Sequence, residues 1–254
     1  MKYDAIIVDL DRTLLRTDKS LSEYTISILK KCRNLGIKIF VASARPLRNI
    51  VYYDSLLNFD GLVVSNGARI IKGDNEKKYF IPFESSKKIY DMMVEHPELR
   101  VTYETGDEAY SNTEIDYFET IICDNLLDVI KEEGLVKIVV GINDENTFGL
   151  VSDYLSNEVY YTIANGYAIQ IMSRDASKWN GVSEMLNLFN ISPSKCIYFG
   201  DDFDDVAPIE KCGVGVAMEN AIDECKKVCN YICKTNDEDG VANFIEEFLF
   251  EEKK

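Results

Sequence analysis

Four short apolar runs, each followed at once by small polar or acidic residues, constrain the fold of this chain more than any other feature. They span residues 5–8, 37–42, 62–64 and 196–199. Mostly apolar runs of this length, without alternation, are typical of strands in a parallel sheet that is covered on both faces. The residues that follow the runs are then expected at the carboxyl edge of one sheet.

Helical patterns separate these runs. Residues 21–34 carry apolar side chains at helical spacing, and Gly36 follows as a helix stop. A strand, a helix and a second strand in this order predict a right-handed crossover with parallel pairing. Residues 179–189 predict another helix, residues 213–217 a short strand, and residues 241–250 a C-terminal amphipathic helix. The predicted fold class is α/β, with a doubly wound, Rossmann-like parallel sheet.

The middle of the chain differs from the rest in composition and in its predicted secondary structure. Residues 81–177 are richer in tyrosine and acid, and strand-like stretches at 99–103, 135–142, 158–163 and 167–172 alternate there with helical patterns. We therefore expect an inserted α+β domain over 81–177, with the core domain formed by residues 1–80 and 178–254.

Charge narrows the classes of partner. The chain has 44 acidic and 28 basic residues, a formal charge of −16, which would repel nucleic acid. The same field repels small phosphate esters, so such a substrate requires a metal ion and placed cations. No apolar stretch approaches the roughly 18 residues of a membrane span and no signal peptide is readable, so we expect no membrane partner and a cytoplasmic location.

The seven cysteines are interpreted as reduced thiols, because their number is odd and their spacing is irregular. Cys225, Cys229 and Cys233 recur every four residues. We interpret this spacing as a face that packs into the core rather than as a metal site.

Oxygen ligands gather at the predicted carboxyl edge, where doubly wound sheets bind ligands. Asp9 and Asp11 repel each other unless a cation lies between them or one keeps a proton, and the carboxylates from 201 to 205 add surroundings that Mg²⁺ prefers. Alone, the segment from Asp9 to Thr13 is explained equally well as a turn or a helix cap. The residues expected at this edge are Asp9, Asp11, Thr13, Ser43, Ser65, Asn66, Asp201, Asp202, Asp204 and Asp205.

Together with Ser43 and Lys178, these acids resemble the motifs of the haloacid dehalogenase superfamily, in particular its Cof-type branch, whose large cap is inserted after the second motif. The resemblance covers nearly the whole chain. The matching segments are residues 9–15, residues 42–46, Lys178 and residues 200–205, with residues 64–68 as a further likeness.

The resemblance implies a Mg²⁺-dependent phosphatase of small phosphorylated metabolites, such as sugar phosphates or similar phosphomonoesters. Asp9 would be the nucleophile that forms an aspartyl-phosphate, and Asp11 the general acid and base. Mg²⁺ would be held by the carboxylates of Asp9 and Asp201 and the backbone carbonyl of Asp11. Lys178 would be the third catalytic residue, which balances the charge on Asp9 and the phosphate. The remaining implied roles are phosphate binding by Ser43, Lys178, Leu10 and Asp11, and support by Thr13, Ala44, Arg45, Arg12, Asn66, Asp204 and Asp205.

Three residues depart from the family pattern. Arg12 and Ala44 stand where glycine is common, and Asp204 replaces the usual asparagine and adds negative charge beside the expected metal. Arg12 is expected to contact the substrate or the cap. In the cap, residues 103–110 are a candidate specificity loop by position. A phosphomutase of the same superfamily, and a catalytically weak module that binds phosphorylated ligands or signals, remain alternatives.

Overall fold

The structure is a computed structural model that describes residues 2–115, 119–123, 126–164 and 166–250. The chain divides into two compact units. The core unit contains the residues up to Arg45, Asn49–Lys77 and the residues from Lys178 onward, and the inserted unit contains Pro46–Arg48 and Lys78–Ser177. The insertion was expected over 81–177. The inserted unit instead begins at Lys78, and it also includes the short segment Pro46–Arg48.

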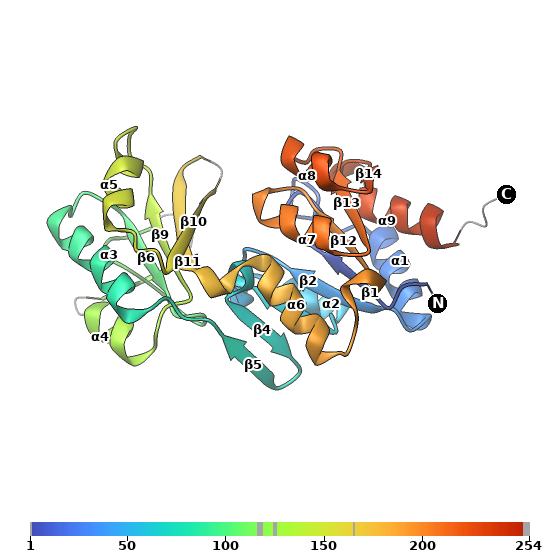
Figure 1. Cartoon of the computed structure of the whole chain (residues 1–254), viewed down its shortest axis with the longest axis horizontal. Coiled ribbons are helices and arrows are strands. Elements are labelled where there is room, and N and C mark those ends of the chain that lie inside the picture. Colours follow the sequence, from blue (N-terminus) through green and yellow to red (C-terminus); the bar gives the residue numbers. More distant parts are fainter. Residues whose placement is uncertain (1, 116–118, 124–125, 165, 251–254) are drawn as a thin grey trace. The chain divides into compact units, whose positions relative to one another are not determined.

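A twisted eight-stranded sheet forms the centre of the core unit (Figure 1). Its strand order is β14-β13-β12-β1-β2-β3-β4-β5, and the pairs from β14 to β3 are parallel. The predicted doubly wound α/β fold is confirmed. The strands are β1 (Ala5–Val8), β2 (Lys38–Ala42), β3 (Gly61–Val64), β4 (Arg69–Lys72), β5 (Asn75–Lys78), β12 (Cys196–Gly200), β13 (Val214–Met218) and β14 (Tyr231–Cys233).

One edge of this sheet was not predicted. β4 pairs antiparallel with β3, and β5 follows β4 in the strand order. β5 reads Asn-Glu-Lys-Lys and is mostly exposed. A charged strand without apolar alternation carries no burial signal in its sequence, and charged residues are common at sheet edges because they discourage pairing with another chain.

Helices cover both faces of the core sheet. α6 contacts β2, β3 and β4 and α7 contacts β12 and β13, whereas α1 packs on β2, α2 and α9, and Figure 1 shows α7 and α9 on opposite sides of the strands. In the described part of the chain, no helix is long and apolar enough to span a lipid bilayer. The helices are α1 (Glu23–Asn34), α2 (Val51–Leu57), α6 (Lys178–Leu188), α7 (Val206–Lys211), α8 (Asp223–Val228) and α9 (Gly240–Ile245).

Two of these helices show how local sequence sets the ends. Ser22 caps α1 by accepting a hydrogen bond from the backbone N–H of Thr25, as an N-cap serine is expected to do. The C-terminal helix predicted over 241–250 is α-helical only to Ile245, and Glu246–Phe250 form a wider π-type turn. The predicted helix is therefore present, although apolar periodicity does not distinguish the two hydrogen-bond patterns.

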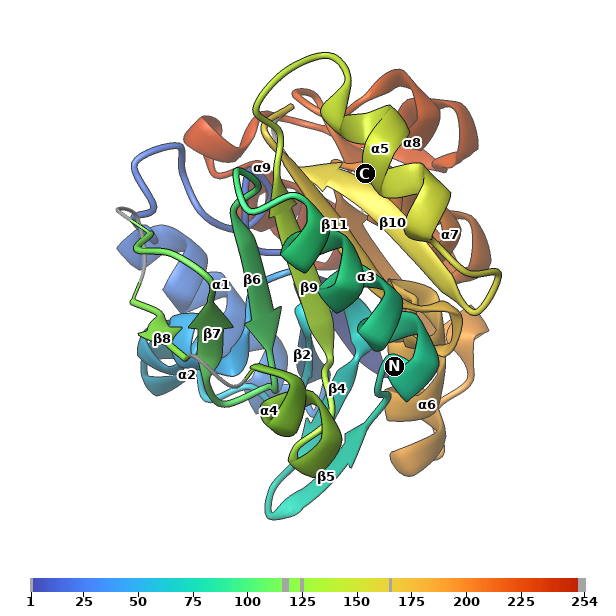
Figure 2. The same cartoon turned by 90° about the vertical axis from the view of Figure 1, so that its left-hand side faces the viewer.

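The inserted unit is a six-stranded sheet with helices on one face (Figure 2). Its strand order is β10-β11-β9-β6-β7-β8, antiparallel except for the pair β7 and β8. The four predicted strands are present, each shifted by one or two residues. The elements are α3 (Phe83–Glu95), β6 (Val101–Glu104), β7 (Ala109–Ser111), β8 (Ile121–Ile122), α4 (Leu126–Glu132), β9 (Lys137–Gly141), α5 (Thr147–Tyr154), β10 (Val159–Ala164) and β11 (Ala168–Ser173).

An apolar core joins this sheet to its helices. Tyr103 on β6 is fully buried in it, beside Met92 and Met93 of α3 and Ile138 of β9. The hydroxyl of Tyr103 lies 3.6 Å from the sulfur of Met93. Tyr103 is therefore a packing residue, and the candidate specificity segment 103–110 begins with a side chain that faces the apolar core.

The cysteines are free thiols. Cys225 lies in α8, Cys229 follows that helix, and Cys233 lies in β14. Cys225 and Cys233 are buried but Cys229 is half-buried, so the four-residue spacing is not one packed face. Burial raises the pKa of the Cys32 thiol to about 11, which keeps it protonated near neutral pH.

Candidate active site

Three neighbouring strands of the core sheet deliver the predicted residues to one edge. Asp9 follows β1, Ser43 follows β2, and Asp201 follows β12, and these strands are adjacent in the sheet. The backbone N–H of Asp9 donates to the carbonyl of Phe199 at 3.0 Å, which continues the parallel ladder past the end of β1. The carboxyl edge therefore brings Asp9 and Asp201 together, as parallel pairing requires.

A buried cluster of three carboxylates forms there. Asp9, Asp201 and Asp205 each offer an oxygen, and these oxygens lie within 4.8 Å of one another. Lys178, the first residue of α6, places Nζ 3.0 Å from Asp9 Oδ1 and 2.6 Å from Asp205 Oδ1. Burial acts to lower the pKa of Lys178, but Asp205 and Asp9 outweigh it and raise that pKa well above its ordinary value. The ammonium therefore stays charged.

Asp205 holds this cluster in place. Its Oδ1 accepts from the Tyr198 hydroxyl at 2.6 Å as well as from Lys178, and its Oδ2 accepts from the backbone N–H groups of Asp201 and Asp202 at 3.0 and 3.1 Å. Because both oxygens are occupied and the side chain is fully buried, Asp205 orients Lys178 and the 201–202 backbone. The sequence had suggested only a supporting role for it.

The remaining two carboxylates fit a hard divalent cation. Burial raises the pKa of Asp9 well above its ordinary value, with Lys178 offsetting part of the effect, and burial with the nearby Asp205 raises the pKa of Asp201 to about 7. When ionised, the three carboxylates outweigh the charge of the one buried ammonium, and a Mg²⁺ ion would balance this excess with the oxygen ligands it prefers. The Thr13 hydroxyl donates to Asp201 Oδ1 at 2.9 Å and so orients that carboxylate.

Arg12 is held against the core unit. Its Nη2 donates to the carbonyl of Asn220 at 2.9 Å, Asn220 Nδ2 donates back to the Arg12 carbonyl at 2.8 Å, and Arg12 Nε lies 3.6 Å from Asp201 Oδ2. The backbone of Arg12 has φ 60°, a left-handed conformation that glycine adopts without a steric penalty. The glycine usual in the family fits this backbone, and this chain tolerates the strain and gains a cation beside Asp201.

Asp11 is separate from the buried cluster and is ion-paired with two cations. Arg45 approaches it through Nε and Nη2 at 2.6 and 2.7 Å, and Lys19 Nζ lies 2.6 Å from Oδ1. Burial acts to raise the pKa of Asp11, but the hydrogen bonds from Arg45 and Lys19 outweigh it and lower that pKa to about 2. Asp11 is thus a carboxylate in the free protein, which is the form of a general base.

Ser43 lies between these groups and a left-handed turn after β3. Its Oγ accepts from the backbone N–H of Arg45 at 3.2 Å, which leaves the hydroxyl hydrogen able to donate. Ser65 and Asn66 have φ 51° and 57°, and their N–H groups donate to the carbonyls of Arg45 and Ser43 at 2.9 and 3.1 Å. Two non-glycine residues in this conformation fix the chain around Ser43.

Asp204 does not join the carboxylate cluster. It accepts a hydrogen bond from Asn66 Nδ2, and Asp205 is the acid of that segment that approaches Asp9. Asp204 was expected beside the metal, but its carboxylate is hydrogen-bonded to Asn66 in the turn after β3. Leu10 is buried, and its carbonyl accepts from Leu15 at 2.8 Å, while Ala44 lies between Ser43 and Arg45 in the chain.

Four residues that contact the site were not identified from the sequence: Lys19, Tyr53, Tyr198 and Asn220. Tyr198 stands in β12 three residues before Asp201, and a tyrosine in a buried strand requires a partner for its hydroxyl, so this signal was readable. The other three reach the site through turns and helices whose side-chain directions the sequence pattern does not specify.

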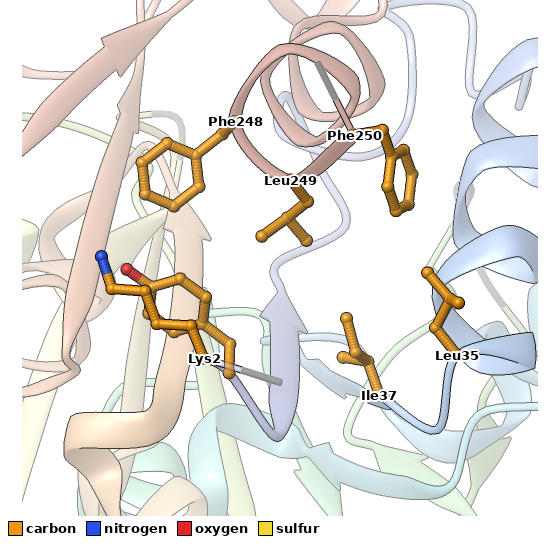
Figure 3. Close-up of a pocket in the computed structure, with 7 residues that line it drawn as sticks. Lys2, Leu35, Ile37, Phe248, Leu249 and Phe250 are labelled. Carbon is orange, nitrogen blue, oxygen red and sulfur yellow. The ribbon is translucent and has the colours of Figure 1, made fainter. Parts of the chain in front are cut away.

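An apolar pocket lies at the opposite edge of the core sheet. Lys2 and Tyr3 precede β1, Ile37 precedes β2, and residues 248–250 from the π-type turn complete the lining with Leu35. Figure 3 shows Phe248, Leu249 and Phe250 above Ile37 and Leu35. This pocket contains none of the predicted site residues.

Comparisons with known proteins point to one family. The family model of haloacid dehalogenase-like hydrolases matches residues 6–245. The chain is 28% identical over 262 residues to the 5-amino-6-(5-phospho-D-ribitylamino)uracil phosphatase of Bacillus subtilis, covering 96% of this chain and 97% of that protein. It is 23% identical over 249 residues to a phosphoglycolate phosphatase of Methanococcoides burtonii, covering 97% and 96%.

A solved structure shows the same fold. The crystal structure of a haloacid dehalogenase-like hydrolase from Bacteroides thetaiotaomicron superposes with a TM-score of 0.87 at 24% identity, covering 97% of this chain and all of that chain. Its likeness shows the fold, and the family model covers nearly the whole sequence. The chain belongs to the haloacid dehalogenase-like hydrolases.

Proposed function

We propose that the protein is a Mg²⁺-dependent phosphatase that hydrolyses small phosphorylated metabolites through an aspartyl-phosphate on Asp9. The observation that carries this proposal is the position of Asp9: its carboxylate follows β1, lies 3.0 Å from the buried ammonium of Lys178, and shares its surroundings with two further carboxylates. The relatives named above are phosphatases of phosphorylated metabolites, which supports the reaction class.

In the first half-reaction, an Asp9 oxygen attacks phosphorus and the ester P–O bond breaks. Lys178 holds the Asp9 carboxylate and balances charge that builds on the phosphoryl group, and the Ser43 hydroxyl donates to a phosphoryl oxygen. A proton reaches the departing alcohol oxygen from Asp11. Since Asp11 is ionised in the free protein, this proton has to arrive with the substrate, and phosphate monoesters carry one in their monoanionic form.

In the second half-reaction, water attacks the phosphorus of the aspartyl-phosphate. The bond between phosphorus and the Asp9 oxygen breaks, and the water proton passes to the carboxylate of Asp11. Asp11 then gives this proton to the departing phosphate and returns to its ionised form. Asp11 already has the ionised form that this step requires, because the hydrogen bonds from Arg45 and Lys19 lower its pKa.

The metal site of this proposal consists of the carboxylates of Asp9 and Asp201 and the backbone carbonyl of Asp11. When bound there, Mg²⁺ would neutralise the repulsion between Asp9 and an incoming phosphate. Asp205 and Thr13 would orient the ligands, since each contacts Asp201 or its backbone.

We assign substrate selection to the inserted unit, as a cap, over the predicted range 81–177. An inserted domain that supplies contacts to the leaving group decides among substrates without altering the chemistry at Asp9. The relatives' names point to phosphorylated sugar alcohol derivatives and small phosphorylated acids as first candidates.

A phosphate-release screen over a panel of sugar phosphates, nucleotides and phosphorylated acids, with Mg²⁺ and with a chelator, tests the proposal. We expect turnover of at least one ester with Mg²⁺, loss of that turnover with the chelator, and none in Asp9→Asn, which keeps the shape and removes the nucleophile. Full activity in Asp9→Asn would refute the assignment of the nucleophile.

A further inference from the structure

The carboxylate of Asp11 is one member of a closed ring of four side chains. Arg45 contacts both carboxylate oxygens at 2.6 and 2.7 Å, and Lys19 reaches Oδ1 at 2.6 Å. The Arg45 guanidinium lies 5.4 Å from the centroid of the Tyr53 ring, and the Tyr53 hydroxyl donates to the Lys19 carbonyl at 3.1 Å. Lys19 and Tyr53 lie outside the four family motifs.

Lys19 is fixed at its backbone although half of its side chain is exposed. Its N–H donates to the Arg16 carbonyl at 2.9 Å, and the N–H of Arg16 donates to the Ser20 carbonyl at 3.0 Å, which closes a tight turn. With the Tyr53 bond, both the N–H and the carbonyl of Lys19 are engaged. Its φ of 68° is left-handed, a conformation that costs a lysine about 1 kcal/mol.

Tyr53 anchors the ring to the body of the core unit. It lies in α2 and is buried except for 7% of its surface. It supports both cations, Arg45 through its ring face and Lys19 through its hydroxyl. Because the Arg45 N–H also donates to Ser43 Oγ, the ring is tied to a second predicted phosphate ligand.

We propose that Lys19 and Tyr53 are positioning residues which, with Arg45, hold the Asp11 carboxylate where it takes the proton of the hydrolytic water. This inference rests on the proposed function. It assigns a task to two residues that no motif identifies.

The geometry explains why such a ring is needed. The Asp11 side chain is 38% exposed, so without the two cations it is free to rotate toward bulk water. A general base acts only within about 2.6 to 3.2 Å of the proton it takes. Arg45 and Lys19 together keep the Asp11 carboxylate in one orientation. When water attacks the aspartyl-phosphate, the general base is therefore already positioned.

The test uses p-nitrophenyl phosphate with Mg²⁺ in a stopped-flow instrument. p-Nitrophenolate departs without protonation, so phosphorylation of Asp9 does not need Asp11, whereas hydrolysis of the intermediate does. We expect Lys19→Met to release about one p-nitrophenolate per protein molecule in a rapid burst and then to turn over about tenfold more slowly than wild type. The KM should fall together with kcat, because the phosphorylated intermediate accumulates, so kcat/KM should change little.

Three further variants separate positioning from a general structural effect. Lys19→Arg should keep the cation and restore most of the turnover. Tyr53→Phe keeps the ring under Arg45 and removes only the hydroxyl, and we expect a fall of about threefold. Lys38→Met is the matched control, because Lys38 is similarly exposed and pairs with Asp60 at 2.7 Å in the same unit; its kinetics should equal those of wild type.

The inference is overturned if Lys19→Met turns over as fast as wild type. It is also overturned if the variant loses activity through a higher KM and shows no burst. The proposed function fails in a different way. In that case Asp9→Asn would keep the wild-type rate of p-nitrophenolate release, or the wild type would release none under any metal condition, whatever residue stands at position 19.

Discussion

Replacing Asp205 with asparagine keeps the shape of the side chain and removes its negative charge. Asp205 is fully buried and accepts four hydrogen bonds, from Lys178, from Tyr198 and from the backbone N–H groups of Asp201 and Asp202. An asparagine has one acceptor oxygen, so it can satisfy one pair of these donors but not both. The amide nitrogen would then face the other pair.

The expected loss of stability follows from this count. Two buried donors lose their acceptor, and each costs about 1 to 3 kcal/mol when it is left unsatisfied. Relief of repulsion with Asp9 and Asp201 offsets part of the cost. We therefore expect Asp205→Asn to lower the free energy of unfolding of the core unit by about 3 kcal/mol, within the range for breaking a buried ion pair.

Urea unfolding followed by tryptophan fluorescence measures this change in the core unit, because the single tryptophan, Trp179, lies in α6 next to Lys178. With an m value of about 3 kcal/mol/M, the midpoint should fall by about 1 M. Asp202→Asn is the matched control: Asp202 is exposed and caps the N–H of Phe203 at 2.8 Å, a role that asparagine fills. Equal midpoints for the two variants would refute the assignment of Asp205 as the anchor.

Four further substitutions test the active site and the packing of individual helices. Lys178→Met should lower kcat/KM by about 100- to 1,000-fold on any accepted ester. A variant with the wild-type kcat/KM in steady-state assays would contradict the catalytic role of Lys178. Arg12→Gly relieves the left-handed backbone but removes the cation 3.6 Å from Asp201, so KM should change on at least some esters; kinetics equal to wild type on every substrate would sink this idea. Gly181→Ala should lower stability by about 1 to 3 kcal/mol, because a Cβ there would lie 2.5 Å from a methyl carbon of Val63. Gly149→Ala, whose Cβ would meet no atom within 4 Å beyond its chain neighbours and its own helix backbone, should instead raise the stability of the inserted unit by about 0.5 to 1 kcal/mol in urea unfolding followed by circular dichroism.

The strand ends show why much of the site was predictable. Apolar runs specify parallel strands, and parallel strands bring their carboxyl ends to one edge, so Asp9, Ser43 and Asp201 converge once the fold class is known. Lys178 follows from the same logic, because it begins a helix that packs on β2, β3 and β4. These positions depend on backbone topology, which residue periodicity encodes well.

The contacts of Asp11 show what periodicity leaves out. Lys19 reaches Asp11 because a left-handed residue closes a tight turn, and Tyr53 supports it from α2. Turn geometry and rotamers of this kind depend on tertiary contacts. The same reason explains why Asp205 rather than Asp204 turned toward Asp9: the 3-10 turn Phe203–Asp205 directs neighbouring side chains to different sides.

The phosphorylated state of Asp9 is the most direct test of the account. The protein would be mixed with an accepted phosphate ester and Mg²⁺, quenched in acid during turnover, digested, and examined by mass spectrometry. We predict one added phosphoryl group on the peptide that contains Asp9, at higher occupancy in Lys19→Met and absent from Asp9→Asn. Steady turnover with an unmodified Asp9 peptide in both wild type and Lys19→Met would contradict the claim that Asp9 is the nucleophile. A phosphoryl group on a different residue would contradict it as well.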